Sequence, residues 1–356
     1  MNYLFFDIEC SVVKQGDSSI CSFGYCLCDE QLNIIEKEDF LMKPYLGYSN
    51  SILETVISYS KETLERQHEF PFYYQKIKNL LENPNNIVIG QSTHYDATYL
   101  SRECNHYNLD NFECVYYDVA DIFLNLFNND NYKSLKDEGL ALNAKSIQSE
   151  LHSSLEDALL TRCVFKELSL KFNIGYKQML LNSKTIGLMG EENHFFDDFR
   201  ILSNNMSKGS TNKKLFIGYN KRIKANVKPD AKLRGKIVVM SQNYEKTHFR
   251  EMIYISYRIK EEGGRYSIDS KFGNYFVSSP LIDQDGNKIF DPRMLNRKKN
   301  SKLIDIKEFL HIINFNDEEC MKFYQYVLDN NILLTKDERN LKKRLFLKER
   351  ARILKN

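Results

Sequence analysis

Two kinds of apolar pattern alternate along the first half of the chain. Short apolar or β-branched runs are typical of strands, and longer stretches with apolar residues every three or four positions are typical of helices. The expected strands are 3–6, 20–28, 34–41, 87–89 and 115–117, and the expected helices are 51–82 (broken at Phe70-Pro71), 119–127, 154–172 and one that starts near Asp96. Hairpin-like strands followed by strand–helix steps predict a mixed sheet flanked by helices.

The second half of the chain returns to the strand–helix pattern after a weaker stretch from about 177 to 228. Within that stretch, 206–214 is polar, small and basic, which favours a linker. The expected strands are 236–241, 266–268, 275–278 and 303–306, the expected helices are 247–262 and 307–313, and a basic helical tail starts at Asn316. We therefore expect a second, smaller α/β domain.

Composition and length narrow the class of protein. A chain of 356 residues is long enough for about two domains, each with its own core. With 42% hydrophobic residues, 28% charged residues and a net charge of +2, the chain has the composition of an ordinary soluble globular protein. Its first residues, MNYLFFDIE, contain an acid where a secretory signal peptide needs a basic start. Its eight cysteines form no C-x-x-C pair. We therefore expect a cytoplasmic protein with reduced thiols.

Asp7 and Glu9 are the first residues that suggest chemistry. They stand two positions apart at the end of an apolar strand, so their side chains should leave the same face of the sheet. Two like charges on one face are costly unless a cation neutralises them. The alternative is a solvated strand end without a ligand.

Two further acidic positions follow strands or open helices. Asp96 comes after the buried strand 87–89, and the alternative for it is an ordinary aspartate in the first turn of a helix. Asp157 follows Ser153 and Ser154, either of which can cap the helix in a capping box with Glu156 or Asp157. His152 lies on the loop before this helix, where it can act as a general base or form a simple surface pair with the acid.

Taken together, the three elements closely resemble the exonuclease motifs of the DEDDh superfamily, which contains the epsilon proofreading subunit of bacterial replicative polymerase and oligoribonuclease. Asp7-x-Glu9 lies on a first strand, Asp96 follows a Gly-ended strand, and His152-x-x-x-x-Asp157 lies at a last helix. The resemblance covers roughly residues 1–173 and implies an RNase H-like fold. Asp118 stands where family members often have an aspartate that is not a ligand, so we expect a structural role for it.

The resemblance also implies a mechanism. Asp7, Glu9, Asp96 and Asp157 would hold two divalent cations, Mg²⁺ or Mn²⁺, and His152 would take a proton from the attacking water. Hard cations select carboxylate oxygen over cysteine or several imidazoles, which fits four acids and one histidine. The cations neutralise charge on the attacking and leaving oxygens of a phosphodiester.

Nucleotide contacts are expected near the motifs. Where family members commonly continue the first motif with Thr-Thr-Gly, this chain has Cys10-Ser11-Val12, so Cys10 and Ser11 occupy positions of contact with the terminal nucleotide. Of the aromatic residues Phe5, Phe6, Tyr95 and Tyr99, some can stack on bases, although strand and helix aromatics usually belong to the core.

Residues 232–315 resemble a BRCT domain, through the strand 236–241, the Gly263-Gly264 pair that closes a helix, and the strand 275–278. The resemblance implies a protein partner or DNA ends as ligands. It also makes Ser241, with a basic residue from 293–299, a candidate phosphate site; the alternative is a turn serine beside a solvated basic face. The basic tail can likewise either follow a phosphate backbone or form a solvated helix.

The expected organisation is an exonuclease domain at 1–175, a connecting segment at 176–230, a BRCT-like domain at 231–315 and a basic helical tail at 316–356. The expected activity is 3′–5′ exonucleolytic release of nucleoside monophosphates, with DNA 3′ ends as the favoured substrate. The alternatives are an exoribonuclease that trims short RNA and an inactive adaptor that binds nucleic acid or protein.

Overall fold

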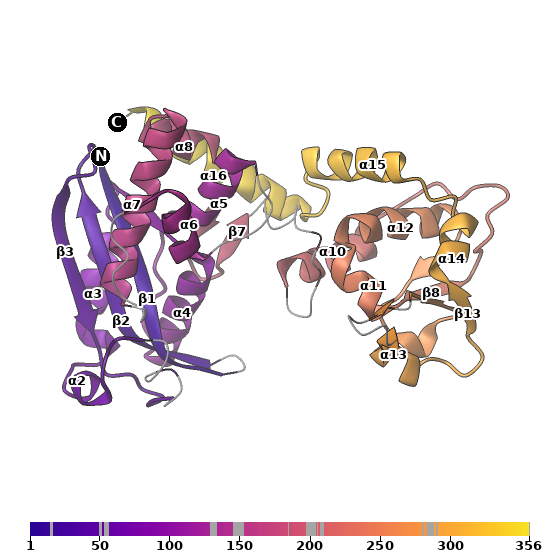
Figure 1. Cartoon of the computed structure of the whole chain (residues 1–356), viewed down its shortest axis with the longest axis horizontal. Helices are drawn as coiled ribbons and strands as arrows, with labels where there is room; N and C mark the ends of the chain where they lie inside the picture. Colours follow the sequence, from indigo (N-terminus) through magenta and orange to yellow (C-terminus); the bar gives the residue numbers. More distant parts are fainter. Residues whose placement is uncertain are drawn as a thin grey trace. The chain divides into compact units, whose positions relative to one another are not determined.

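The computed structural model describes residues 1–14, 17–49, 52, 57–128, 134–144, 153–183, 185–196, 204, 206, 210–279, 281–282, 288–289 and 291–355. The chain divides into two compact units. The first comprises Met1–Phe199 together with Arg344–Asn356, and the second comprises Arg200–Lys343. Figure 1 shows the sheet and helices of each unit.

A seven-stranded mixed sheet forms the centre of the first unit, in the order β3-β2-β1-β4-β5-β6-β7. The strands are β1 (Asn2–Lys14), β2 (Asp17–Cys28), β3 (Ile34–Leu41), β4 (Asn86–Gly90), β5 (Val115–Asp118), β6 (Ile186–Leu188) and β7 (His194–Phe196). Strands β1, β4 and β5 run parallel to one another, and the other neighbouring pairs are antiparallel. This confirms the predicted mixed sheet.

Helices flank the sheet of the first unit. They are α2 (Lys61–Glu65), α3 (Phe70–Leu81), α4 (His94–His106), α5 (Val119–Phe127), α6 (Leu135–Ala141), α7 (Ser154–Phe172) and α8 (Tyr176–Asn182). Alternate side chains of β1 face different helices. Leu4 and Phe6 belong to a core shared with α3 and α4, whereas Tyr3 and Phe5 contact Phe165 of α7.

The expected helix 51–82 differs from the structure. Its described part contains the short helix α2 and the separate helix α3, which begins at Phe70. Pro71 lies in the first turn of α3, where its missing N–H costs no hydrogen bond, so it starts a helix rather than interrupting one.

The expected connecting segment 176–230 also contains regular structure. Strands β6 and β7 extend the seven-stranded sheet beyond β5, and each is only three residues long, too short to give a clear alternating pattern. Helix α10 (Thr211–Arg222) begins inside the expected linker, where the Ser210 hydroxyl accepts a hydrogen bond from Lys213 N at 3.2 Å. Ser210, which contributed to the prediction of a linker, therefore caps a helix.

The second unit contains a four-stranded, entirely parallel sheet in the order β13-β10-β8-β9. Its strands are β8 (Ile237–Met240), β9 (Arg265–Tyr266), β10 (Tyr275–Ser278) and β13 (Lys302–Asp305); the pair β11 (Leu281–Ile282) and β12 (Lys288–Ile289) forms a small ribbon. The helices are α10, α11 (Gln242–Thr247), α12 (Phe249–Glu261), α13 (Pro292–Leu295), α14 (Ile306–Ile312) and α15 (Asp317–Asp329), with the 3₁₀ turn η1 (Ser270–Phe272). The expected second α/β domain is therefore present as a parallel sheet with helices.

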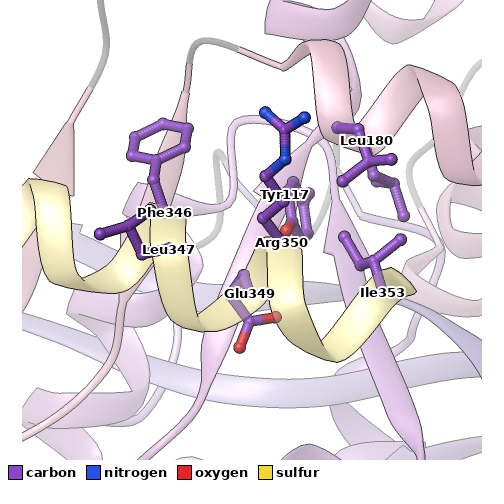
Figure 2. Close-up of a pocket in the computed structure, with 8 residues that line it drawn as sticks. Tyr117, Leu180, Phe346, Leu347, Glu349, Arg350 and Ile353 are labelled. Carbon is purple, nitrogen blue, oxygen red and sulfur yellow. The ribbon is translucent and has the colours of Figure 1, made fainter. Parts of the chain in front are cut away.

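Residues 344–355 pack with the first unit. They belong to helix α16 (Lys336–Lys355), the tail that the sequence predicts to be helical. Ile353 is fully buried, and the Arg352 guanidinium donates to the carbonyl oxygen of Asn86 at the start of β4. Figure 2 shows Ile353 and Glu349 on the same stretch of helix, beside Tyr117 of β5. A buried apolar residue, Ile353, thus lies within a basic stretch of sequence.

Among the described residues, no helix combines the length and the apolar character needed to span a membrane.

Candidate active site

Asp7 and Glu9 lie on the face of β1 that is turned toward α7. They alternate with Leu4, Phe6 and Ile8, whose side chains enter the core on the opposite face. In the antiparallel ladder Asp7 pairs with Gly24 of β2, and Glu9 pairs with Ser22. The period of the strand therefore brings both carboxylates to one face, as the sequence predicts.

Asp157 reaches these two acids from the first turn of α7. Carboxylate oxygens of Asp7, Glu9 and Asp157 all lie within 4.8 Å of one another. Three acids from two elements far apart in the sequence thus converge on a space the size of a cation with its ligands. Such convergence is unfavourable for three bare anions, since like charges at this distance repel.

Asp96 lies beside the three-acid cluster, in the first turn of α4 after β4. Its side chain is buried, and among the described residues its Oδ2 atom has no hydrogen-bond partner. Burial, then the charge of Asp118 and then that of Glu9, raises the pKa of Asp96. Burial followed by the charges of Asp96, Glu9 and Asp157 raises the pKa of Asp7 well above its usual range.

The donor set of this cluster fits a hard divalent cation. Carboxylate oxygens are the ligands that Mg²⁺ and Mn²⁺ prefer, and neither cysteine sulfur nor imidazole belongs to the group of three converging acids. A bound cation would also satisfy the buried Oδ2 atom of Asp96, which otherwise bears an uncompensated desolvation cost. The residues present therefore suit the metal that the motifs imply.

The capping of α7 differs from the sequence prediction. Ser153 is the residue before the helix, but its side chain makes no capping hydrogen bond, so the expected capping box is wrong. Instead the phenol oxygen of Tyr59 accepts a hydrogen bond from Ser154 N at 3.2 Å. A residue nearly one hundred positions away thus takes the role expected of a local serine.

Asp118 fixes the turn that leads to Asp96. Its carboxylate accepts hydrogen bonds from Ser92 N and Thr93 N, each at 3.0 Å, and from Ala120 N at 3.1 Å. Ser92 has a φ of 56°, a left-handed conformation that its hydrogen-bonded neighbours help to hold. The structural role predicted for Asp118 agrees with these contacts.

The predicted nucleotide-contact residues differ in their accessibility. Cys10 is buried in the core, and the buried Ser11 hydroxyl donates to the carbonyl oxygen of Gly47 at 2.7 Å, so their surroundings give no support to that role. Tyr95 is 53% exposed, one residue before Asp96. The ring of Tyr99 is covered by the Arg102 guanidinium at 5.9 Å. Phe5 and Phe6 belong to the core.

His152 lies outside the described residues, two positions before the start of α7 in the sequence. Its role as a general base therefore stays a prediction from the sequence.

Ser241 of the second unit is buried at the end of β8. Its hydroxyl accepts a hydrogen bond from Tyr244 N at 3.3 Å and so caps α11. The nearby Arg293 guanidinium binds the buried carboxylate of Glu245 at 2.7 and 2.8 Å, and it also donates to the carbonyl oxygen of Met240. These contacts match the alternative of a turn serine and lend no support to a phosphate site.

Four residues around the acidic cluster escape sequence reasoning. Asp39 and Tyr59 form hydrogen bonds with the start of α7, and Gly24 lies under it. Glu103 accepts a hydrogen bond from Ile20 N at 3.3 Å. Ile20 lies where the ladder between β1 and β2 shifts register, next to Glu9. Only Gly24 leaves a signal, as a glycine inside a strand, which often marks close approach of another backbone.

Comparison with known proteins gives one family match. Residues 4–165 match the family described as Exonuclease (RNase T). No curated protein sequence matches the chain.

Several solved structures are similar to this chain at low identity. A structure titled as 3′-end specific recognition of histone mRNA stem-loop by 3′-exonuclease is 12% identical, with a TM-score of 0.42 over 49% of this chain and 83% of that one. Exonuclease X in complex with 5′ overhanging duplex DNA is 10% identical, has a TM-score of 0.39, and covers 50% of this chain and 96% of its own. E. coli exonuclease I with an oligonucleotide is 12% identical, has a TM-score of 0.43, and covers 93% of this chain and 72% of its own.

At such low TM-scores the assignment rests on the family match and on the motif residues within it. The matched range contains Asp7, Glu9, Asp96 and Asp157, three of which the structure brings together around one point. Residues 4–165 therefore form an exonuclease domain of the RNase T family, which comprises DEDDh-type 3′–5′ exonucleases, and the protein is a nuclease.

Proposed function

We propose that the protein removes nucleoside monophosphates from the 3′ ends of DNA by cation-dependent hydrolysis. The observation that carries this proposal is the convergence of Asp7, Glu9 and Asp157 within 4.8 Å, with Asp96 buried beside them. A purely structural domain would gain nothing from such a cluster, because the repulsion between the acids lowers stability. This argues against the alternative of an inactive adaptor.

Asp7, Glu9 and Asp157 would hold one divalent cation, and Asp96 together with Asp7 would hold a second, with Mg²⁺ or Mn²⁺ as the ions. Such a pair supplies charge neutralisation for the attacking and leaving oxygens of the phosphodiester. The protein's own contribution is to fix the carboxylates on rigid elements, the strand β1 and the first turns of α4 and α7. Fixed ligands need no rearrangement as charge develops during the reaction.

His152 is the proposed general base. In the sequence it stands five positions before Asp157, which matches the spacing of the family's last motif. Loss of a positioned base costs roughly 10²–10⁴ in rate. We expect His152→Ala to keep its fold and its cation binding and to lose turnover by that factor. A His152→Ala variant with the parent rate would remove this residue from the mechanism.

DNA is the favoured substrate because residues 232–315 resemble a BRCT domain in sequence, a module that binds protein partners or DNA ends. Support for the resemblance comes from the parallel four-stranded sheet and from the turn after α12, where Gly263 has a φ of 74°. An exoribonuclease remains the second candidate, because the acidic cluster itself does not distinguish the sugar. The exposed ring of Tyr95, next to Asp96, offers either substrate a surface for stacking.

One assay separates these proposals. Single-stranded DNA and RNA of the same sequence carry a 5′ label and are incubated with the full chain in Mg²⁺, Mn²⁺ or EDTA. The proposal predicts a ladder of products shortened one nucleotide at a time, only with a cation, and faster on DNA. Faster shortening of RNA would favour the exoribonuclease, and no shortening of either strand would contradict both.

A further inference from the structure

We propose that Asp39, Tyr59 and Ser22 form a positioning network that sets the first turn of α7, and with it Asp157, against Asp7 and Glu9. The inference rests on the proposed function, since Asp157 matters as a ligand only if the acidic cluster binds cations. None of the three residues touches the cluster as a ligand in the proposed mechanism. They act through the helix that carries Asp157.

The first argument comes from a row of residues across the sheet. Asp7 of β1 pairs with Gly24 of β2, and Gly24 pairs with Asp39 of β3, so the three lie side by side and share one face. A β-carbon at Gly24 would lie 2.1 Å from Leu155 N and 2.2 Å from the carbonyl carbon of Ser154. The start of α7 therefore rests on bare backbone between Asp7 and Asp39.

The second argument is the hydrogen bonding around Asp39. One carboxylate oxygen accepts from the Ser22 hydroxyl at 2.5 Å and from the Ser154 hydroxyl at 3.0 Å. The other accepts from the Tyr59 hydroxyl at 2.5 Å. The hydroxyls of Ser22 and Ser154 also contact each other. Strands β2 and β3 are thus tied to the helix start through one carboxylate.

The third argument is the replacement of the local helix cap. Because Tyr59 donates its proton to Asp39, its oxygen is left to accept from Ser154 N at 3.2 Å, and it also contacts the Ser153 hydroxyl at 3.0 Å. Burial, followed by the charge of Asp39, raises the pKa of Tyr59, so the phenol keeps the proton that this arrangement requires. The negative charge of Asp39 near a helix N-terminus is itself favourable.

The network affects the cluster because Asp157 lies in the helical turn that the network holds. The backbone N–H of Asp157 donates to Ser153 O at 2.8 Å, and this bond closes the first turn of α7, which contains Ser153 and Ser154. Loss of the network would let this turn fray, since the helix has no side-chain cap of its own. Fraying would move one ligand and leave Asp7 and Glu9, on β1, in place.

The test compares Tyr59→Phe and Asp39→Asn with a matched control, Tyr25→Phe. Tyr25 lies on β2 and, like Tyr59, donates a 2.5 Å hydrogen bond to a carboxylate of β3, that of Glu36. Its ring, however, enters the core on the face away from α7. The control therefore removes the same kind of tyrosine–carboxylate bond to the same strand, β3, without touching the start of the helix.

The first readout is amide hydrogen exchange of residues 154–158 in the metal-free full chain. Because hydrogen bonds to charged groups are stronger than those between neutral groups, we expect Tyr59→Phe and Asp39→Asn to speed exchange there about tenfold or more. We expect Tyr25→Phe to leave it unchanged. Equal exchange in all four proteins, or equal acceleration by the control, would overturn the network.

The second readout is Mn²⁺ affinity, which a merely structural role would leave unchanged. We expect about tenfold weaker binding in both network variants and parent-like binding in Tyr25→Phe. Faster exchange with unchanged Mn²⁺ affinity would show that the network caps the helix without positioning Asp157, and would overturn the inference. Faster exchange in a protein whose parent binds no Mn²⁺ would instead count against the proposed function.

Discussion

Gly24 pairs with Asp7 in the ladder between β1 and β2, and the first turn of α7 lies directly on it. The absence of a side chain at this position is what brings the backbone of Ser154 close to the strand that carries two of the acids. Asp157 follows three residues later on the same helix. The geometry of the acidic cluster therefore depends on a glycine that has no chemistry of its own.

Cation binding should depend on pH. The raised pKa values of Asp7 and Asp96 mean that these carboxyls hold protons to higher pH than ordinary acids when no cation is present. A cation must displace those protons, so its affinity should rise as the pH rises, and binding should release protons. Calorimetric Mn²⁺ titrations in two buffers of different ionisation enthalpy measure the release. Equal heats in both buffers and an affinity independent of pH would contradict this account.

Glu103 should make the stability of the metal-free protein depend on pH. Burial raises the pKa of this group to about 8, against a usual value of 4.5. The folded state therefore binds more protons than the unfolded state between those values, so the contribution to stability is full below the lower value and falls as the pH rises toward the upper one. Glu103→Gln keeps an acceptor for Ile20 N and has no proton to lose.

We expect the free energy of unfolding of Glu103→Gln to exceed that of the parent increasingly across this window. Urea unfolding in EDTA, at a series of pH values, gives the difference directly. A difference that stays constant with pH would show that Glu103 titrates as an ordinary acid.

The end of the chain should stabilise the exonuclease domain. Ile353 is 1% exposed against this unit, whereas its neighbour Leu354 is 65% exposed. Truncation of a buried isoleucine to alanine costs about 2–5 kcal/mol, and a surface change usually costs less than about 0.5 kcal/mol. We expect Ile353→Ala to speed hydrogen exchange in β4 and β5 and Leu354→Ala to leave it near the parent rate. Equal effects of the two variants would mean that the end of α16 is not part of the domain.

Much of the fold is predictable because its elements carry clear patterns. The expected strand 34–41 and the expected helices 119–127 and 154–172 have the bounds of β3, α5 and α7. Asp7 and Glu9 could be assigned to one face because a strand alternates with period two. Their approach to Asp157 follows from the order of the motifs, which the family resemblance supplied.

The parts that escaped prediction depend on contacts between distant residues. Nothing in the residues around Asp39 or Tyr59 indicates that they meet at the start of α7, because only the folded sheet brings them together. Strands β6 and β7 are too short to show a period. The burial of Ile353 could not be predicted, since the residues near it in the sequence are mostly charged.

The central claim is that the converging acids hold the cations on which hydrolysis depends, and Asp7→Asn tests it most directly. Mn²⁺ binding, thermal stability in EDTA and shortening of a labelled DNA strand are measured on the same preparations of the parent and the variant. The account predicts that Asp7→Asn loses Mn²⁺ affinity by at least about tenfold and loses turnover below detection. It also predicts that the variant is at least as stable as the parent in EDTA, because it removes a carboxyl whose ionisation is opposed by burial and by the neighbouring acids. An Asp7→Asn protein that binds Mn²⁺ and shortens DNA like the parent would contradict it.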